Sequence, residues 1–120
     1  MRVQHLIDGN AVKSRDYFET VNPATQEVLA EVARGGADEV NAAVAAAKAA
    51  FPAWAAKPAA ERAKLMRRLG DLITQHVPDL SDTETRDTGQ VIGQTRKQLV
   101  PRAAENFHYF AEMCTRVDGQ

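Results

Sequence analysis

The spacing of the apolar residues changes near Gly35-Gly36, and this change limits the possible folds of the 120-residue chain more than any other feature. Before this point, short apolar segments flank residues that favour turns, which is typical of β-hairpins. After it, apolar residues recur three or four positions apart, which is typical of amphipathic helices. The sequence therefore predicts an α+β chain, with β-hairpins in residues 1–36 followed by about four helices in residues 37–120.

Two turns are predicted within the hairpin part. Asp8-Gly9-Asn10 lies between two apolar pairs, and Asp-Gly favours a tight hairpin because glycine accepts a positive φ. Asn22-Pro23-Ala24-Thr25 separates Tyr17–Val21 from Glu27–Val32. Pro23 marks this second turn, because proline has no N–H to donate to a strand ladder.

Prolines and glycines divide the helical part. Asp38 is placed to cap the first helix, and Pro52 is expected to close it. Gly89 is expected to end the third helix in the left-handed conformation, and Pro101 either kinks the fourth helix or sets its start. The four helices are expected at residues 38–51, 58–76, 79–88 and 92–117.

The charge balance and the single cysteine exclude several kinds of partner and site. The 15 Lys and Arg residues nearly match the 16 Asp and Glu residues, which argues against nucleic acid and membrane surfaces as partners. Cys114 alone forms neither an internal disulfide nor a zinc site with two cysteines, and a lone thiol suits a cytoplasmic setting. We expect neither a secretory signal nor a membrane-spanning segment.

The residues that could carry chemistry do not form a catalytic group in the sequence. Cys114 lies on the apolar face of the last predicted helix, where we expect it to pack as a small apolar residue. His108 and Glu112 share one helix face, but a metal site would need a third ligand. The glycines fit neither a dinucleotide-binding pattern nor a P-loop. We therefore expect no catalytic residue and no cofactor-binding residue in this chain.

Two further features allow more than one interpretation. Arg96, Lys97 and Arg102 concentrate positive charge near the last predicted helix. They form either an exposed basic face over an aromatic core or a clamp for a carboxylate, which arginine binds in bidentate geometry. Asp87 lies near the carboxyl end of the third predicted helix, where a carboxylate opposes the helix dipole. We expect it to have a partner, either a buried arginine or a bound cation.

Several segments form a colinear series that covers nearly all of the chain. They are Leu6-Ile7-Asp8-Gly9, Asn22-Pro23-Ala24-Thr25-Gln26-Glu27-Val28, Asp38-Glu39-Val40-Asn41-Ala42-Ala43-Val44, Ala46-Ala47-Lys48-Ala49-Ala50-Phe51-Pro52-Ala53-Trp54, Glu61-Arg62, Glu84-Thr85-Arg86-Asp87-Thr88-Gly89 and Tyr109-Phe110-Ala111. With this series the chain resembles the start of the aldehyde dehydrogenase superfamily. Within that superfamily it is most similar to the 5-carboxymethyl-2-hydroxymuconate semialdehyde dehydrogenases of aromatic catabolism.

The resemblance implies a cytoplasmic, homo-oligomeric enzyme of the α/β aldehyde dehydrogenase fold, which oxidises a semialdehyde to a carboxylic acid with NAD. In that family a cysteine attacks the aldehyde, hydride passes to NAD, and water hydrolyses the thioester. Those residues lie beyond residue 120, and Cys114 does not match the motif of the catalytic cysteine. The resemblance thus implies an N-terminal segment that is inactive by itself. In it, residues 1–36 belong with the oligomerisation region, residues 37–120 pack on the cofactor-binding domain, and the catalytic domain is absent.

Five residues acquire expected roles from the same resemblance. Thr20, Val21 and Asp87 match the family's monovalent-cation site, which uses main-chain oxygens near these positions. Gln98 and Arg102 match positions that line the substrate tunnel, where an arginine suits a substrate with carboxylates. The alternative is a non-enzymatic helical interaction module that binds its partner through alanine-rich faces, since 21 of the residues are alanine.

Overall fold

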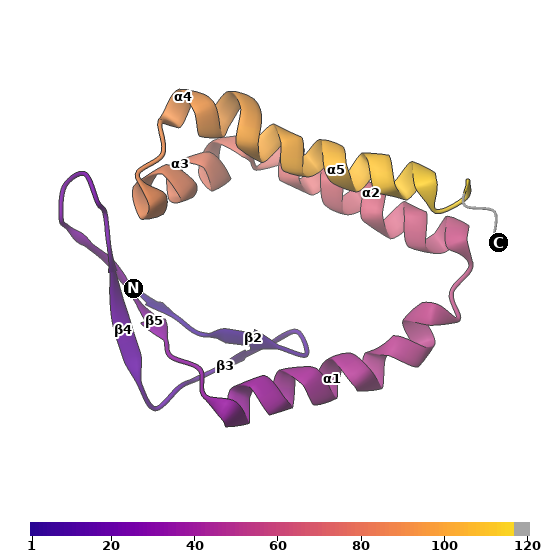
Figure 1. Ribbon diagram of the computed structural model, residues 1–120, viewed down its shortest axis with the longest axis horizontal. Helices are drawn as coiled ribbons and strands as arrows, with labels where there is room; N and C mark the ends of the chain where they lie inside the picture. The colour runs from indigo at the N-terminus through magenta and orange to yellow at the C-terminus, as the bar shows by residue number, and fades with distance from the viewer. Residues whose placement is uncertain (117–120) are drawn as a thin grey trace. The chain divides into compact units, whose positions relative to one another are not determined.

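The computed structural model describes residues 1–116, which confirm the predicted α+β class. The chain divides into two compact units, Met1–Ala56 and Lys57–Gln120. The first holds the strands and helix α1, and the second holds the remaining helices (Figure 1). The predicted division after residue 36 is where the strands give way to α1. Among the described residues, none of the helices is long and apolar enough to cross a membrane.

The first predicted hairpin is confirmed. Strands β2 (His5–Ile7) and β3 (Asn10–Val12) pair antiparallel, with Ile7 opposite Asn10. The two residues between them, Asp8 and Gly9, have φ values of 52° and 73°. A two-residue type I′ turn requires a positive φ at both positions, which the Asp-Gly pair tolerates.

The second hairpin is also confirmed, and it belongs to a three-stranded sheet in the order β1-β5-β4. Strand β4 (Tyr17–Val21) pairs antiparallel with β5 (Val28–Ala33), whereas β1 (Arg2–Val3) runs parallel to β5. Two interactions of Arg2 hold β1 in place. Its guanidinium forms an ion pair with Glu31 of β5 at 2.8 Å and lies 4.9 Å from the centre of the Tyr17 ring. Strand β1 was not predicted, because two residues show no periodicity.

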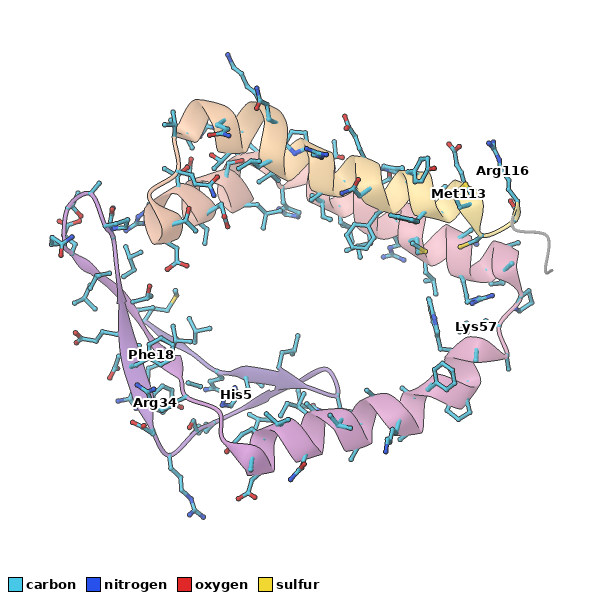
Figure 2. All side chains as sticks on the ribbon, in the orientation of Figure 1. His5, Phe18, Arg34, Lys57, Met113 and Arg116 are labelled. Atoms are coloured by element: carbon cyan, nitrogen blue, oxygen red, sulfur yellow. The ribbon has the colours of Figure 1, made fainter. Side chains whose placement is uncertain are left out.

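A second arginine stacks on this sheet. The guanidinium of Arg34 lies 5.0 Å from the centre of the Phe18 ring (Figure 2). The same guanidinium pairs with Asp16 at 2.9 Å. The loop before β4 is fixed to the end of β5 in addition, because the Ser14 hydroxyl donates to the Arg34 carbonyl oxygen at 2.7 Å.

Helix α1 (Ala37–Ala55) begins differently from the prediction, because Gly36 and not Asp38 is its N-cap residue. The Glu39 carboxylate accepts a hydrogen bond from the Gly36 N–H at 2.7 Å. Hydrogen bonds from the backbone N–H groups of Gly36 and Glu39 lower the pKa of Glu39 from its ordinary value of 4.5. These hydrogen bonds therefore stabilise the folded chain fully when the pH is above the ordinary pKa of Glu39. Their contribution is lost as the pH falls through the lower pKa that Glu39 has in the folded state. The Glu39 carboxylate, at the third position of the helix, therefore contributes to capping in place of Asp38.

The prediction that Pro52 closes the helix is also wrong. Helix α1 continues to Ala55, because proline keeps a helical φ and its carbonyl oxygen still accepts the N–H of Ala56 at 3.0 Å. None of the described residues of α1 is buried. Val40 is 59% exposed and Phe51 is 65% exposed, so the apolar stripe to which these two residues belong has no cover within this unit.

In the second unit, α2 (Ala59–Gln75) packs antiparallel on α5 (Val100–Met113), and the two lie side by side in Figure 1. Small residues make this contact, because Ala63, Gly70, Ala104 and Ala111 are buried. A side chain at position 70 would collide with the neighbouring helix, since an added Cβ would lie 2.7 Å from the His108 Nε2. The predicted helix 58–76 is thus confirmed, with Pro58 as its N-cap residue.

Helix α3 (Val77–Thr88) confirms the third predicted helix and its end. Gly89 follows it with φ 76° and ψ 10°, in the left-handed conformation, and donates its N–H to the Thr85 carbonyl oxygen at 2.9 Å. Glycine takes this conformation without the steric cost that a Cβ introduces.

The fourth predicted helix is not a single regular helix. It consists of α4 (Ile92–Gln94), the π-helical segment η1 (Thr95–Leu99) and α5. The Val100 N–H bonds to the Thr95 carbonyl oxygen, five residues back. Pro101 explains the wider turn, because its ring would clash with the carbonyl group four residues earlier in a regular α-helix. Residue 117, at which this helix was predicted to end, lies outside the described residues.

The left-handed end of α3 generates a stability prediction. We expect Gly89→Ala to lower the free energy of unfolding by about 1 kcal/mol, because an L-residue is strained at this φ. Urea unfolding followed by circular dichroism measures the change. Gly93→Ala is the matched control, since Gly93 lies in α4 with nothing within 4 Å of an added Cβ. An equal loss of stability in both variants would contradict this explanation.

Candidate functional site

The two residues predicted to contact substrate lie four positions apart in the second unit. Gln98 belongs to η1, and Arg102 belongs to the first turn of α5. Both side chains are exposed. Within residues 1–116, no ion pair or hydrogen bond is found for the Arg102 guanidinium. An exposed guanidinium and an exposed amide both offer hydrogen-bond donors to a carboxylate.

The predicted basic cluster is divided by pairing. Arg96 donates to the Asp82 carboxylate of α3 at 2.6 Å. Arg96 therefore ties η1 to α3 rather than offering its charge to an anion. The Asp82 side chain is exposed as well as paired. Of the two arginines in the cluster, Arg102 is the better candidate to bind an anionic ligand.

Sequence reasoning missed the residue that anchors η1 from inside. Thr95 is fully buried, and its hydroxyl bonds to the Thr85 hydroxyl of α3 at 2.8 Å. It also donates to the Ile92 carbonyl oxygen at 3.1 Å. A threonine gives no periodic signal, and its burial follows from the packing of η1 on α3. The only indication in the sequence is Pro101 six residues later, which makes an irregular turn necessary.

An apolar hollow lies on the α2–α5 pair. It has a volume of about 290 Å³, and five residues line it: Met66, Ala103, Asn106, Phe107 and Phe110. Asn106 is the only polar side chain among these five. The hollow therefore provides an apolar surface without an acid, a base or a nucleophile.

The three residues of the predicted cation site belong to different units. Thr20 and Val21 end β4, where the pairing with β5 shifts its register between these two residues. Such an irregularity disturbs the ladder locally and changes the direction of main-chain groups. Asp87 lies in the last turn of α3, just before Thr88 and Gly89. The carbonyl dipoles of that turn point toward the carboxyl end of the helix, where a cation is favoured.

The remaining candidates have structural neighbours. Cys114 is partly buried, and its Sγ lies 3.8 Å from the Met66 Sδ, across the α2–α5 contact. His108 pairs with Asp71 at 3.4 Å, whereas Glu112 pairs with Arg116 at 3.6 Å. Among the described residues, no group of three His, Cys, Asp or Glu side chains is placed to hold a metal ion.

The start of α1 does not fit a nicotinamide dinucleotide. A pyrophosphate needs free N–H groups and a positive field at a helix N-terminus. Here the Glu39 carboxylate already accepts the Gly36 N–H, and Asp38 adds a second negative charge in the first turn. We assign no cofactor contact to the start of α1.

Comparison with known proteins gives one consistent family. A sequence model of the aldehyde dehydrogenase family matches residues 10–120. The chain is 57% identical over 119 residues to a 5-carboxymethyl-2-hydroxymuconate semialdehyde dehydrogenase of Escherichia coli, covering 99% of this chain and 25% of the relative. It is 34% identical over 125 residues to a 2-aminomuconic semialdehyde dehydrogenase of Bos taurus, covering 98% and 26%.

A solved structure shows the same backbone. The chain superposes on an aldehyde dehydrogenase from Bacillus cereus in complex with NAD⁺ with a TM-score of 0.95 and 35% identity. The match covers 100% of this chain and 25% of that one. The chain therefore spans about a quarter of the length of the proteins that it matches.

Proposed function

This chain belongs to the aldehyde dehydrogenase family, and we propose that it is the N-terminal segment of an NAD-dependent semialdehyde dehydrogenase. The complete enzyme converts an aldehyde, NAD⁺ and water into a carboxylic acid, NADH and a proton. The substrate is 5-carboxymethyl-2-hydroxymuconate semialdehyde, from aromatic catabolism in the cytoplasm. The observation that carries the proposal is the 57% identity, over 99% of the chain, to a dehydrogenase of that semialdehyde.

The proposal assigns substrate recognition, rather than chemistry, to this segment. Gln98 and Arg102 bind a carboxylate of the substrate, with the Arg102 guanidinium as the charged partner. Both side chains are exposed, which supports this role. Arg96 pairs with Asp82, so Arg102 is the arginine of the cluster without such a partner among the described residues. The catalytic cysteine, the cofactor contacts and the general base belong to other parts of the enzyme.

The exposed apolar faces support a place inside a larger, homo-oligomeric protein. We propose that residues 1–36 join the oligomerisation region and that residues 37–120 pack on the cofactor-binding domain. Val40 and Phe51 of α1 are 59% and 65% exposed, and Tyr109 and Phe110 of α5 are 59% and 57% exposed. Apolar faces of this extent are normally covered in a stable protein.

The first test uses the 120-residue chain by itself. We expect no NADH formation with NAD and any aldehyde, because no residue here matches the one that forms the thiohemiacetal. The uncovered faces are also expected to bind a hydrophobic dye and to cause aggregation. Activity would refute the assignment of chemistry to other parts of the enzyme. A monodisperse chain that unfolds cooperatively and binds no dye would favour the alternative, a helical interaction module.

The second test concerns Arg102 in the complete enzyme. We expect Arg102→Leu to raise KM for the carboxylated semialdehyde by roughly tenfold or more, because a hydrogen bond to a charged group contributes about 1.5–3 kcal/mol. KM for a neutral aliphatic aldehyde is expected to stay within about twofold of its original value. Arg96→Leu is the matched control, since its guanidinium already pairs with Asp82. Equal effects on both substrates would remove the clamp.

The third test concerns the monovalent cation, which we propose is held by oxygens of Thr20, Val21 and Asp87. In the complete enzyme, K⁺ or Na⁺ is expected to raise the melting temperature relative to a choline buffer of equal ionic strength. Asp87→Asn is expected to reduce this difference, because the amide lacks the negative charge. Asp79→Asn, at the opposite end of α3, is the control. A difference unchanged in Asp87→Asn would exclude that carboxylate from the site.

A further inference from the structure

We propose that Thr95 is a positioning residue for substrate recognition, because its buried hydroxyl fixes the π-helical turn that sets the position of Gln98 relative to Arg102. This inference rests on the proposed role of Gln98 and Arg102 in binding a substrate carboxylate. It adds a residue that touches neither substrate nor cofactor and acts through the shape of the turn.

The hydroxyl of the buried Thr95 joins two elements, η1 and α3. Thr95 is 0% exposed, and its Oγ1 lies 2.8 Å from the Thr85 Oγ1 on α3. The same oxygen lies 3.1 Å from the Ile92 carbonyl oxygen, so both sides of the hydroxyl are used. If the Thr95 hydroxyl is removed, its partners lose a hydrogen bond without regaining full contact with water, and this loss costs free energy. The bond between Thr95 and Thr85 therefore holds the first residue of η1 against α3.

The second link between these elements is weaker. Arg96 and Asp82 pair at 2.6 Å, but their side chains are 48% and 58% exposed. Exposed ion pairs contribute little, because water screens the charges and the long side chains lose freedom. Of the two links, the hydrogen bond between the buried Thr95 and the half-buried Thr85 is the one that determines where η1 begins.

The width of the turn decides which way Gln98 points. On a regular α-helix each residue advances about 100° around the axis. The π turn takes up one extra residue, so that Gln98 is rotated by about that amount from its place on a regular helix. Arg102 lies beyond the turn, where the buried Ala104 fixes α5. The relative position of Gln98 and Arg102 thus depends on whether the turn at Thr95 keeps its π geometry.

Two variants separate the hydroxyl from the shape of the side chain. Thr95→Val keeps the volume and the branched Cβ but removes the hydroxyl, whereas Thr95→Ser keeps the hydroxyl. In the complete enzyme, we expect Thr95→Val to raise KM for the carboxylated semialdehyde by roughly three- to tenfold. We expect KM for a neutral aliphatic aldehyde to stay within about twofold. Thr95→Ser is expected to restore the original ratio of the two KM values.

Thr83→Val is the matched control. Thr83 lies on the same helix as Thr85, is exposed, and donates only to the Asp79 carbonyl oxygen of its own helix at 2.9 Å. Its ratio of KM values is expected to stay unchanged. A lower melting temperature in Thr95→Val with an unchanged KM ratio would show a purely structural role and overturn the inference. An equal rise of both KM values would overturn it as well.

A double variant distinguishes failure of this inference from failure of the proposed function. If Thr95 acts through the recognition pair, then Thr95→Val adds no further change in the KM ratio when Arg102 is already leucine. Additive effects would overturn the inference while leaving the role of Arg102 intact. An Arg102→Leu variant with an unchanged KM ratio would refute the proposed role of Arg102, and with it the inference.

Discussion

The close contact between α2 and α5 is the constraint on which the rest of the second unit depends. Alanine and glycine make this contact, so the two helix backbones approach closely and few large side chains are buried. Gly70 has no side chain and so leaves space for the His108 ring of α5. Because Ala104 faces this contact, Arg102 two residues earlier lies on the opposite side of α5 and is exposed. The position of the candidate recognition residue therefore follows from the packing of small residues on the far side of its helix.

The same reliance on small residues leaves large apolar side chains outside. Helix α1 has no buried residue among those described, although its apolar stripe is regular. In a protein that folds by burying apolar area, such a stripe is a contact surface for something else. The uncovered apolar faces are consistent with the finding that the chain matches only about a quarter of the length of each relative. They support the proposal that this chain is stabilised by further parts of a dehydrogenase.

Features that depend on a few neighbouring residues could be predicted from the sequence. The Asp8-Gly9 turn and the left-handed Gly89 are local, because the backbone conformation there is decided by glycine. The N-cap residue of α1 and the end of this helix were predicted wrongly. Each depends on which of two nearby residues gives the helix end the better hydrogen bonds. The π turn could not be predicted, because it depends on Thr95 meeting Thr85 from another helix. The proposed roles of Gln98 and Arg102 came from the family resemblance, because the residues alone favoured an exposed basic face.

In the proposed function, the recognition residues of this segment are exposed, whereas the residue that positions them is buried. Substitutions at exposed positions usually change stability by less than about 0.5 kcal/mol, and Gln98 and Arg102 are both exposed. Their side chains can therefore change between relatives with different substrates at little cost to the fold. Thr95 is in the opposite situation, because it is buried and its hydroxyl bonds to two partners. Thr95 fixes the turn from the inside, and Pro101 makes it wide, so the turn presents exposed side chains in one geometry. Under the proposed role of these side chains, substrate preference can change while the helix that carries them keeps its structure.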